Sequence, residues 1–274
     1  MDNKTSGVSI IRVTGGRPES VTDRVACEEP LGIAVEMDGT PGREQRDVSI
    51  TMRTPGHDAE LATGFLFTEG IIHGPGDIGQ IVNDHAGGDR VIVSLAPGVR
   101  PALNSLDRNF YTTSSCGVCG KASLEAVALA CDPVRSSISV DAEVLVSLPG
   151  RLRMVQQAFG ETGGLHAAGL FTPTGDLLAM HEDVGRHNAV DKVIGTLLMR
   201  DQQLFRDAVL MLSGRISFEL VQKAAMAGIP VVAAVGAPSS LAIGLAETKG
   251  ICLAGFIRGD RFNVYTFADR IRTR

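Results

Sequence analysis

The chain has 274 residues, 44% of them hydrophobic, and a formal net charge of −5. The negative charge argues against a nucleic-acid-binding protein held by phosphate contacts, and no apolar stretch reaches the ~20 residues of a membrane-spanning helix. The N-terminus lacks the basic and apolar regions of a signal peptide, and an odd number of cysteines, five, suits a reducing compartment. We therefore expect a cytoplasmic protein that binds neither nucleic acid nor membranes, with one large domain or two smaller ones.

The first part of the chain predicts mostly strands. Residues 1–20 are polar and predict a flexible N-terminal lead, and residues 21–110 predict a smaller, β-rich N-terminal subdomain. Most of its patterns alternate apolar and polar side chains, and one stretch at helical spacing has Asp58 as its expected cap. The predicted elements are a strand at residues 8–13, a hairpin of residues 31–37 and 47–52, a helix over residues 58–70 and a strand at residues 90–95.

Strands and helices alternate in the rest of the chain, residues 111–274. Repeated strand–helix–strand units predict parallel pairing with right-handed crossovers, so we expect an α/β domain here. The predicted helices cover residues 124–131, 152–159, 190–198, 216–228 and 241–250. The predicted strands cover residues 165–171, 176–181, 208–212, 230–235, 251–257 and 261–267.

Three polar turns follow strands of this domain, and each leads into a helix. They cover residues 181–188, 213–217 and 236–240. In open α/β sheets ligands bind beyond the carboxyl ends of the strands, where the free N–H groups of helix starts favour an anion. One such turn alone is explained as an ordinary helix cap. Three in succession, two of which carry Arg186 and Arg215, predict a pocket for a phosphate or a nucleotide.

The strongest candidate for reactive chemistry is the pair Cys116 and Cys119. Residues 112–121 read Thr-Thr-Ser-Ser-Cys-Gly-Val-Cys-Gly-Lys and lead into a helical pattern. A structural zinc site usually takes two close pairs of ligands, and the chain has one such pair. A zinc deaminase needs H-x-E followed by P-C-x-x-C, a spacing that the sequence does not offer.

Two other chemistries fit this pair. A thioredoxin-like enzyme places C-x-x-C at a helix start after a strand, and the residues before Cys116 make a poor strand. Sulfur carriage needs an accessible thiolate of low pKa on a pliant segment, and Cys116 precedes a helix start with Lys121 close by. Spacing alone leaves redox chemistry and sulfur carriage both open. The remaining cysteines lie in apolar or strand contexts and are expected to be small buried side chains, namely Cys27, Cys131 and Cys252.

One motif and six further segments carry a family likeness. The motif is residues 113–123, which include both cysteines. The further segments span nearly the whole chain, at residues 52–56, 60–66, 163–168, 182–192, 213–215 and 255–265. Together they resemble the FdhD family of formate dehydrogenase accessory sulfurtransferases.

The resemblance implies a function, a fold and partners. Family members take sulfur from a cysteine desulfurase as a persulfide and pass it to the molybdenum cofactor, in its bis-guanine dinucleotide form, for formate dehydrogenase. Cys116 would carry the persulfide, and Cys119 would assist or resolve a disulfide. The implied fold is a three-layer α/β sandwich similar to the cytidine deaminase fold without its zinc, and the implied assembly is a homodimer. The alternative remains a C-x-x-C redox or structural zinc-binding module.

The resemblance also implies where the cofactor binds, with a GDP-like nucleotide as an analogue and with no metal ligands in the chain. The matching segment is Phe256, Ile257, Arg258, Gly259, Asp260 and Arg261. The strand-end turns add Asp183, Arg186, His187, Ser213, Gly214 and Arg215. Asp183 has two candidate roles, a cap of the following helix or a partner for the guanine base, and the cap is favoured. His166, His181 and His187 are candidate cofactor contacts.

Overall fold

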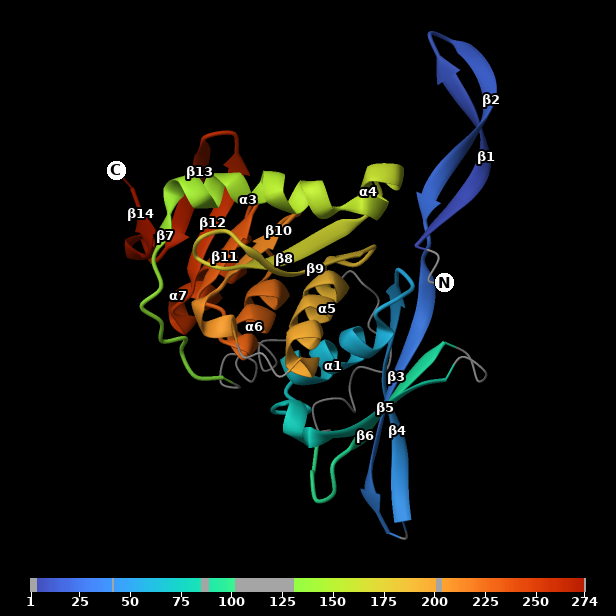
Figure 1. Cartoon of the computed structure of the whole chain (residues 1–274), viewed down its shortest axis with the longest axis vertical. Coiled ribbons are helices and arrows are strands. Elements are labelled where there is room, and N and C mark those ends of the chain that lie inside the picture. The colour runs from blue at the N-terminus through green and yellow to red at the C-terminus, as the bar shows by residue number, and fades with distance from the viewer. Residues whose placement is uncertain (1–3, 41, 85–88, 102–130, 201–203, 274) are drawn as a thin grey trace.

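A six-stranded sheet forms the centre of the molecule. The computed structural model describes residues 4–40, 42–84, 89–101, 131–200 and 204–273. The strand order is β13-β12-β11-β10-β8-β9 (Figure 1), and β10, β11 and β12 pair in parallel as predicted, whereas the outer pairs are antiparallel. The bounds are β8 His166–Phe171, β9 Leu177–Asp183, β10 Val209–Leu212, β11 Val231–Ala234, β12 Cys252–Arg258 and β13 Arg261–Thr266.

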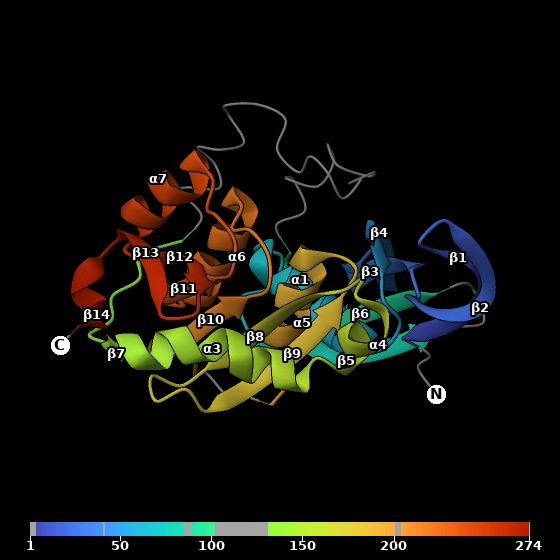
Figure 2. The ribbon, with the colours of Figure 1, turned by 90° about the horizontal axis from the view of Figure 1, so that it is seen from above.

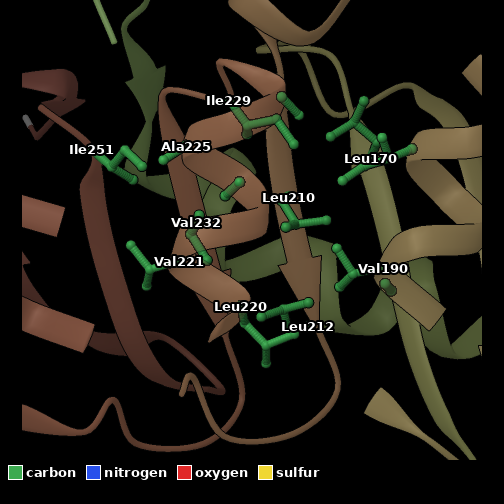
Figure 3. Packing of buried hydrophobic residues seen from close by; sticks show 14 of the residues in the cluster. Leu170, Val190, Leu210, Leu212, Leu220, Val221, Ala225, Ile229, Val232 and Ile251 are labelled. Carbon is green, nitrogen blue, oxygen red and sulfur yellow. The ribbon is translucent and has the colours of Figure 1, made fainter. Parts of the chain in front are cut away.

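Helices cover both faces of this sheet (Figures 1 and 2). One face carries α3 Ala142–Val155 and α4 Gln157–Thr162, and the other carries α5 Arg186–Met199, α6 Phe218–Ala227 and α7 Ser240–Lys249. Successive side chains of a strand point to opposite faces, so Val209 and Met211 of β10 pack in the core beside α3. Leu210 and Leu212 pack against α5 and α6 instead (Figure 3). The predicted three-layer α/β sandwich is confirmed.

A second sheet of four strands lies in the N-terminal part, in the order β4-β3-β6-β5. The bounds are β3 Glu29–Gly39, β4 Gly42–Arg53, β5 Ile78–Asp84 and β6 Arg90–Leu95. The predicted hairpin and the strand at β6 are confirmed. β5 was missed because it is an edge strand without a fully buried side chain, so its sequence shows no clear alternation. Helix α1, Asp58–Thr68, covers this sheet with Leu61, Ala62 and Leu66.

The N-terminal residues form a hairpin, which corrects the prediction of a loose lead with one short strand over residues 1–20. β1 Thr5–Thr14 and β2 Arg17–Ala26 pair antiparallel, and Figure 1 shows the ribbon extending away from the rest of the molecule. Almost none of its side chains is buried, so a polar sequence here reflects exposure on both faces. At its base, Arg24 pairs with Glu161 of α4 at 2.8 Å.

The structure corrects two helix predictions. Asp58 begins α1 but does not cap it, because His57 stands at the N-cap in a left-handed conformation with φ 60°. The Asp58 carboxylate instead accepts two hydrogen bonds from the guanidinium of Arg53, each at 3.0 Å. The single helix predicted over residues 152–159 is the end of α3 and the start of α4, which meet at Gln156.

Helix α1 packs directly on α5 and so joins the N-terminal sheet to the sandwich. Gly64 of α1 and Gly195 of α5 form the closest part of this crossing. A Cβ on Gly64 would lie 1.9 Å from the carbonyl oxygen of Asp191, and a Cβ on Gly195 would lie 1.9 Å from that of Glu60. The two backbones therefore meet at a distance that only glycine permits.

Short elements complete the described chain, and some predicted features fall outside it. β7 Val140–Asp141 pairs with β14 Ile271–Arg272, and short 3-10 helices cover Pro75–Asp77, Leu204–Asp207 and Ala268–Arg270. None of the helices in the described ranges is long and apolar enough to cross a bilayer. The boundary expected at residue 110, the loop at residues 112–121 and nearly all of the helix expected at residues 124–131 lie outside the described residues.

Candidate functional site

The carboxyl ends of several strands and the start of β8 meet at one edge of the central sheet. β8 runs antiparallel to β10, so its first residue, His166, lies near Ser213, which follows β10. The Ser213 N–H donates to the carbonyl of Ala167 at 3.0 Å, and the Ser213 hydroxyl accepts from the Ala167 N–H at 2.8 Å. His166 also pairs with Asp183 at the end of β9. We call this edge the strand-end rim, which comprises His166 and residues 183–188, 213–217, 236–239 and 256–261.

Backbone hydrogen bonds join the turns of the rim. The Gly236 N–H donates to the carbonyl of Gly214 at 3.0 Å, and the Phe256 N–H donates to the carbonyl of Gly236 at 3.1 Å. A Cβ on Gly236 would lie 2.7 Å from the carbonyl oxygen of Gly214, so this approach requires glycine. A further bridge connects Ile216 and Pro238. The turns that the sequence predicted separately therefore form one continuous surface.

Arg186 opens helix α5 at the rim and carries an unsatisfied donor. Its Nε atom is buried and has no hydrogen-bond partner in the described part of the chain. A buried donor left unpaired costs ~1–3 kcal/mol, and more when the group is charged. An anion at the rim would satisfy this donor, and the free N–H groups at the start of α5 favour the same charge. Arg215, the second predicted arginine, is exposed.

His166 presents a neutral imidazole at the rim. Burial, and then the positive charges of Arg186 and His187, lower the pKa of His166. Near pH 7 one of its ring nitrogens therefore donates a hydrogen bond and the other accepts one. Gly214 leaves room for the ring, because a Cβ there would lie 3.3 Å from His166 Nδ1.

His187, in the first turn of α5, is held by the start of α6. Its Nε2 lies 3.3 Å from the hydroxyl of Ser217 and 3.8 Å from the carboxylate of Glu219. The hydrogen bond with His187 is the largest of the effects that lower the pKa of Glu219 to about 2. Glu219 therefore stays ionised at ordinary pH and fixes the His187 ring beside Arg186.

Asp183 is fully buried and anchors the turn that carries Arg186. Its Oδ1 accepts from the N–H of Gly185 at 2.8 Å and from the side-chain amide of Asn188 at 3.0 Å. Its Oδ2 accepts from the N–H of Thr54 at 3.2 Å and pairs with the ammonium of Lys192 at 2.7 Å. These donors surround the carboxylate, so Asp183 acts as a support of the rim in this structure.

The N-terminal part of the chain clamps the same turn. The amide of Asn188 donates to the carbonyl of Met52 at 2.8 Å and accepts from the hydroxyl of Thr51 at 3.2 Å. Lys192 donates to the carbonyl of Thr54 at 2.8 Å. Sequence reasoning gave none of these residues a role, because the contacts join positions more than a hundred residues apart and leave no trace in local periodicity.

The segment at residues 256–261 forms the turn between β12 and β13. Phe256 has a positive φ of 55°, uncommon for an aromatic residue, and 39% of its surface is exposed. Such strained backbone recurs at ligand sites. Ile257 points the other way, into the core beneath α3. The remaining predicted residues of the segment are exposed, namely Arg258, Gly259, Asp260 and Arg261.

His181 lies inside the sandwich and not on the rim. Its Nε2 is 2.7 Å from the hydroxyl of Thr196, and the His57 ring lies edge-on with ring centroids 4.4 Å apart. Burial, and then the charges of His57 and Lys192, lower the pKa of His181 to about 3. The ring is therefore neutral, and its contacts lie within the fold and away from the rim.

The predicted reactive cysteines, Cys116 and Cys119, lie outside the described residues. Of the described thiols, Cys252 is buried as predicted, and burial raises its pKa to about 12. Burial also raises the pKa of Cys131, which is half-buried like Cys27. Among the described residues, no group of three or more His, Cys, Asp or Glu side chains is placed to hold a metal ion.

Comparison with known proteins gives a consistent result along the chain. The model of the FdhD/NarQ family matches residues 26–272. The "Sulfur carrier protein FdhD" of Mycobacterium tuberculosis is 52% identical over 267 residues, which cover 93% of this chain and 92% of that protein. The protein of the same name from Streptomyces coelicolor is 48% identical over 284 residues, which cover 100% of this chain and 98% of that protein. The structure also resembles a crystal structure described as "a putative formate dehydrogenase accessory protein from Desulfotalea psychrophila". The two superpose with a TM-score of 0.77 and 26% sequence identity, over 98% of this chain and 99% of that one.

Proposed function

The chain belongs to the FdhD/NarQ family, and on that premise we propose that it is a sulfur carrier. It takes sulfane sulfur from a cysteine desulfurase as a persulfide on Cys116. It delivers this sulfur to the molybdenum cofactor in its bis-guanine dinucleotide form, which formate dehydrogenase then uses. The observation that carries the proposal is similarity over nearly the whole chain to relatives named as sulfur carriers.

Loading of the carrier is a thiol exchange. The thiolate of Cys116 attacks the terminal sulfur of the desulfurase persulfide, and the desulfurase thiolate leaves. The sulfane sulfur changes carrier without net oxidation. In the sequence, small residues surround Cys116 and Lys121 follows five positions later, a pattern that favours an accessible thiolate.

Delivery of the sulfur as sulfide needs two electrons, which Cys119 supplies. Its thiolate attacks Sγ of Cys116, the two residues form a disulfide, and the terminal sulfur leaves as hydrosulfide toward the molybdenum centre. A cellular dithiol then reduces the disulfide and restores the carrier. This role makes Cys119 necessary for repeated turnover but not for loading.

The cofactor is the substrate that receives the sulfur, and the strand-end rim suits its nucleotide ends. The unpaired Nε of Arg186 and the exposed guanidinium of Arg215 supply donors for a diphosphate. The neutral imidazole of His166 offers a further hydrogen bond. The exposed aromatic ring of Phe256 and the arginines of residues 258–261 extend the same surface.

We further propose that the carrier is a cytoplasmic homodimer. A twofold pair would present two rims, which suits a cofactor with two guanine nucleotides. The β1–β2 ribbon offers apolar surface for a second copy, because Ile11 and Val13 are 61% and 64% exposed. A molar mass of one chain by light scattering at micromolar concentration would exclude the dimer.

Persulfide loading is tested by intact mass after incubation with a cysteine desulfurase and cysteine. The protein should gain the mass of one sulfur atom that a reductant removes. Cys116→Ala should not gain it, whereas Cys119→Ala and the control Cys27→Ala should. Equal gain by Cys116→Ala would contradict the proposal. One zinc per chain that is lost when both motif cysteines are replaced would favour the zinc-binding alternative.

A further inference from the structure

The segment at residues 52–56 carries part of the family likeness, yet neither the loading nor the delivery of sulfur uses it. Thr54 lies at the centre of this segment, directly after β4, and is completely buried. Its polar contacts are with the turn at residues 183–188, which leads from β9 into α5 and carries Arg186. The segment therefore connects the N-terminal sheet to the rim.

Three polar groups of Thr54 bind this turn and the helix that follows it. The Thr54 N–H donates to Oδ2 of Asp183 at 3.2 Å, and the Thr54 hydroxyl accepts from the N–H of Val184 at 3.1 Å. The Thr54 carbonyl accepts from the ammonium of Lys192 at 2.8 Å. One residue of the N-terminal part thus fixes both the turn and α5.

These bonds decide which N–H groups of the turn stay open to a ligand. The N–H of Val184 is bound by the hydroxyl of Thr54, and that of Gly185 by the carboxylate of Asp183 at 2.8 Å. The next three N–H groups begin α5 and have no partner within the helix. They are left for an anion, together with the buried Nε of Arg186, which has no partner in the described part of the chain.

The same contacts control the charge beneath the rim. The buried carboxylate of Asp183 would repel an anion, but the ammonium of Lys192 lies 2.7 Å from its Oδ2 and offsets its charge. The carbonyl of Thr54 holds this ammonium in place. The positive charge of Arg186 and the dipole of α5 therefore dominate at the rim.

Arg53 makes Thr54 a rigid support. Its guanidinium is 2% exposed, with Nη1 3.1 Å from the carboxylate of Glu29 and Nη2 3.0 Å from that of Asp58. Nη2 also lies 3.2 Å from the carboxylate of Asp89. These partners precede or begin β3, α1 and β6, so three elements hold the end of β4. A shift of Thr54 would pull a buried charge away from its partners, which is costly.

We propose that Thr54 is a positioning residue for anion binding, which holds the turn at residues 183–188 so that Arg186 and the start of α5 meet a phosphate of the ligand. Thr54 itself does not contact the ligand and acts through the turn. The inference rests on the proposed function, because it concerns the rim to which we assign the nucleotide ends of the cofactor. Affinity for a diphosphate should therefore depend on a hydroxyl buried beneath the site.

The test is calorimetry on the full-length protein with inorganic pyrophosphate as the probe. Thr54→Val keeps the shape of the side chain and leaves the N–H of Val184 without its acceptor, so the affinity should fall roughly tenfold. Thr54→Ala, which also lacks the hydroxyl, should give the same loss and replaces Thr54→Val if that variant does not fold. Thr54→Ser keeps the hydroxyl and should restore the affinity to within about twofold of the wild type. Arg186→Met should weaken pyrophosphate at least as much as Thr54→Val.

Thr266→Val is the matched control for loss of a buried threonine hydroxyl. The Thr266 hydroxyl accepts from the N–H of Leu253 at 3.0 Å and donates to the carbonyl of Ile251 at 2.6 Å. These contacts lie at the start of β12, the end opposite to the rim. Urea unfolding should show both valine variants to be less stable than the wild type, whereas only Thr54→Val should lose affinity for pyrophosphate. Equal loss of affinity in both would reduce the effect to general destabilisation and overturn the inference.

The remaining outcomes separate this inference from the proposed function. Thr54→Val that binds pyrophosphate as the wild type does overturns the inference. So does Arg186→Met with unchanged affinity, because the anion then binds elsewhere. Wild-type protein that loads the persulfide but binds no pyrophosphate also overturns it, and leaves sulfur carriage standing. Wild-type protein that gains no sulfur, while the variants show the expected affinities, removes the carrier function and leaves the role of Thr54 supported.

Discussion

Replacement of Gly64 by alanine tests whether the α1–α5 crossing joins the two parts of the molecule. The new Cβ would lie 1.9 Å from the carbonyl oxygen of Asp191, whereas ordinary contact needs about 3.5 Å. Backbone atoms cannot swing aside, so the helices must separate by about 1.5 Å. Overpacking of this kind costs about 3 kcal/mol, and the gain from replacing a helical glycine returns about 1 kcal/mol. The net loss in free energy of unfolding is therefore about 2 kcal/mol.

The assay is urea unfolding with thermal melting as a second measure. A loss of about 2 kcal/mol corresponds to a fall in melting temperature of about 4–8 °C for a chain of this size. Gly244→Ala is the control, because it lies in the interior of α7 with no atom within 4 Å of its added Cβ. It should stabilise the protein by about 0.5–1 kcal/mol. Equal stability of Gly64→Ala and Gly244→Ala would refute the close crossing.

The remaining predictions concern buried ionisable groups and one helix cap. His181 has a pKa of about 3 in the folded protein against 6.5 in the unfolded chain. Between these pH values the unfolded chain binds more protons than the folded protein. The free energy of unfolding therefore falls as the pH drops from about 6.5 toward 3, by up to about 1.4 kcal/mol per pH unit. His181→Gln should flatten this slope in urea titrations, and an unchanged slope would assign the acid sensitivity elsewhere. Lys192→Met leaves Asp183 buried without its cation and should cost about 3 kcal/mol, measured by the same unfolding assay; a cost under about 0.5 kcal/mol would show that the other donors to Asp183 suffice. The hydroxyl of Ser239 caps α7 by accepting from the N–H of Ala242, so Ser239→Ala should lower the free energy of unfolding by about 1 kcal/mol in the same assay. No change would mean that water replaces the cap.

Periodicity located most elements because it reports which side of each element is buried. Every strand of the central sheet was predicted, because its apolar side chains pack into the hydrophobic core on one face of the sheet or the other. Turns that contain glycine mark the ends of these strands in the sequence. The β1–β2 ribbon was predicted only as one short strand, and β5 was missed, because both lack a buried side. Exposed strands bury too little to mark their sequence with alternation.

By itself, the sequence determined the ingredients of the strand-end rim: polar glycine turns after successive strands, two of them with arginine. Only the tertiary structure decided how these are held and what lies beside them. The clamp of Thr54, Asn188 and Lys192 on Asp183 and the capping of α4 by Glu182 join residues that are distant in the chain. The break between α3 and α4 at Gln156 accompanies that capping. Local patterns record which residues are buried, but the partner that each buried polar group finds, or lacks, is set by contacts that form only when the whole chain has folded.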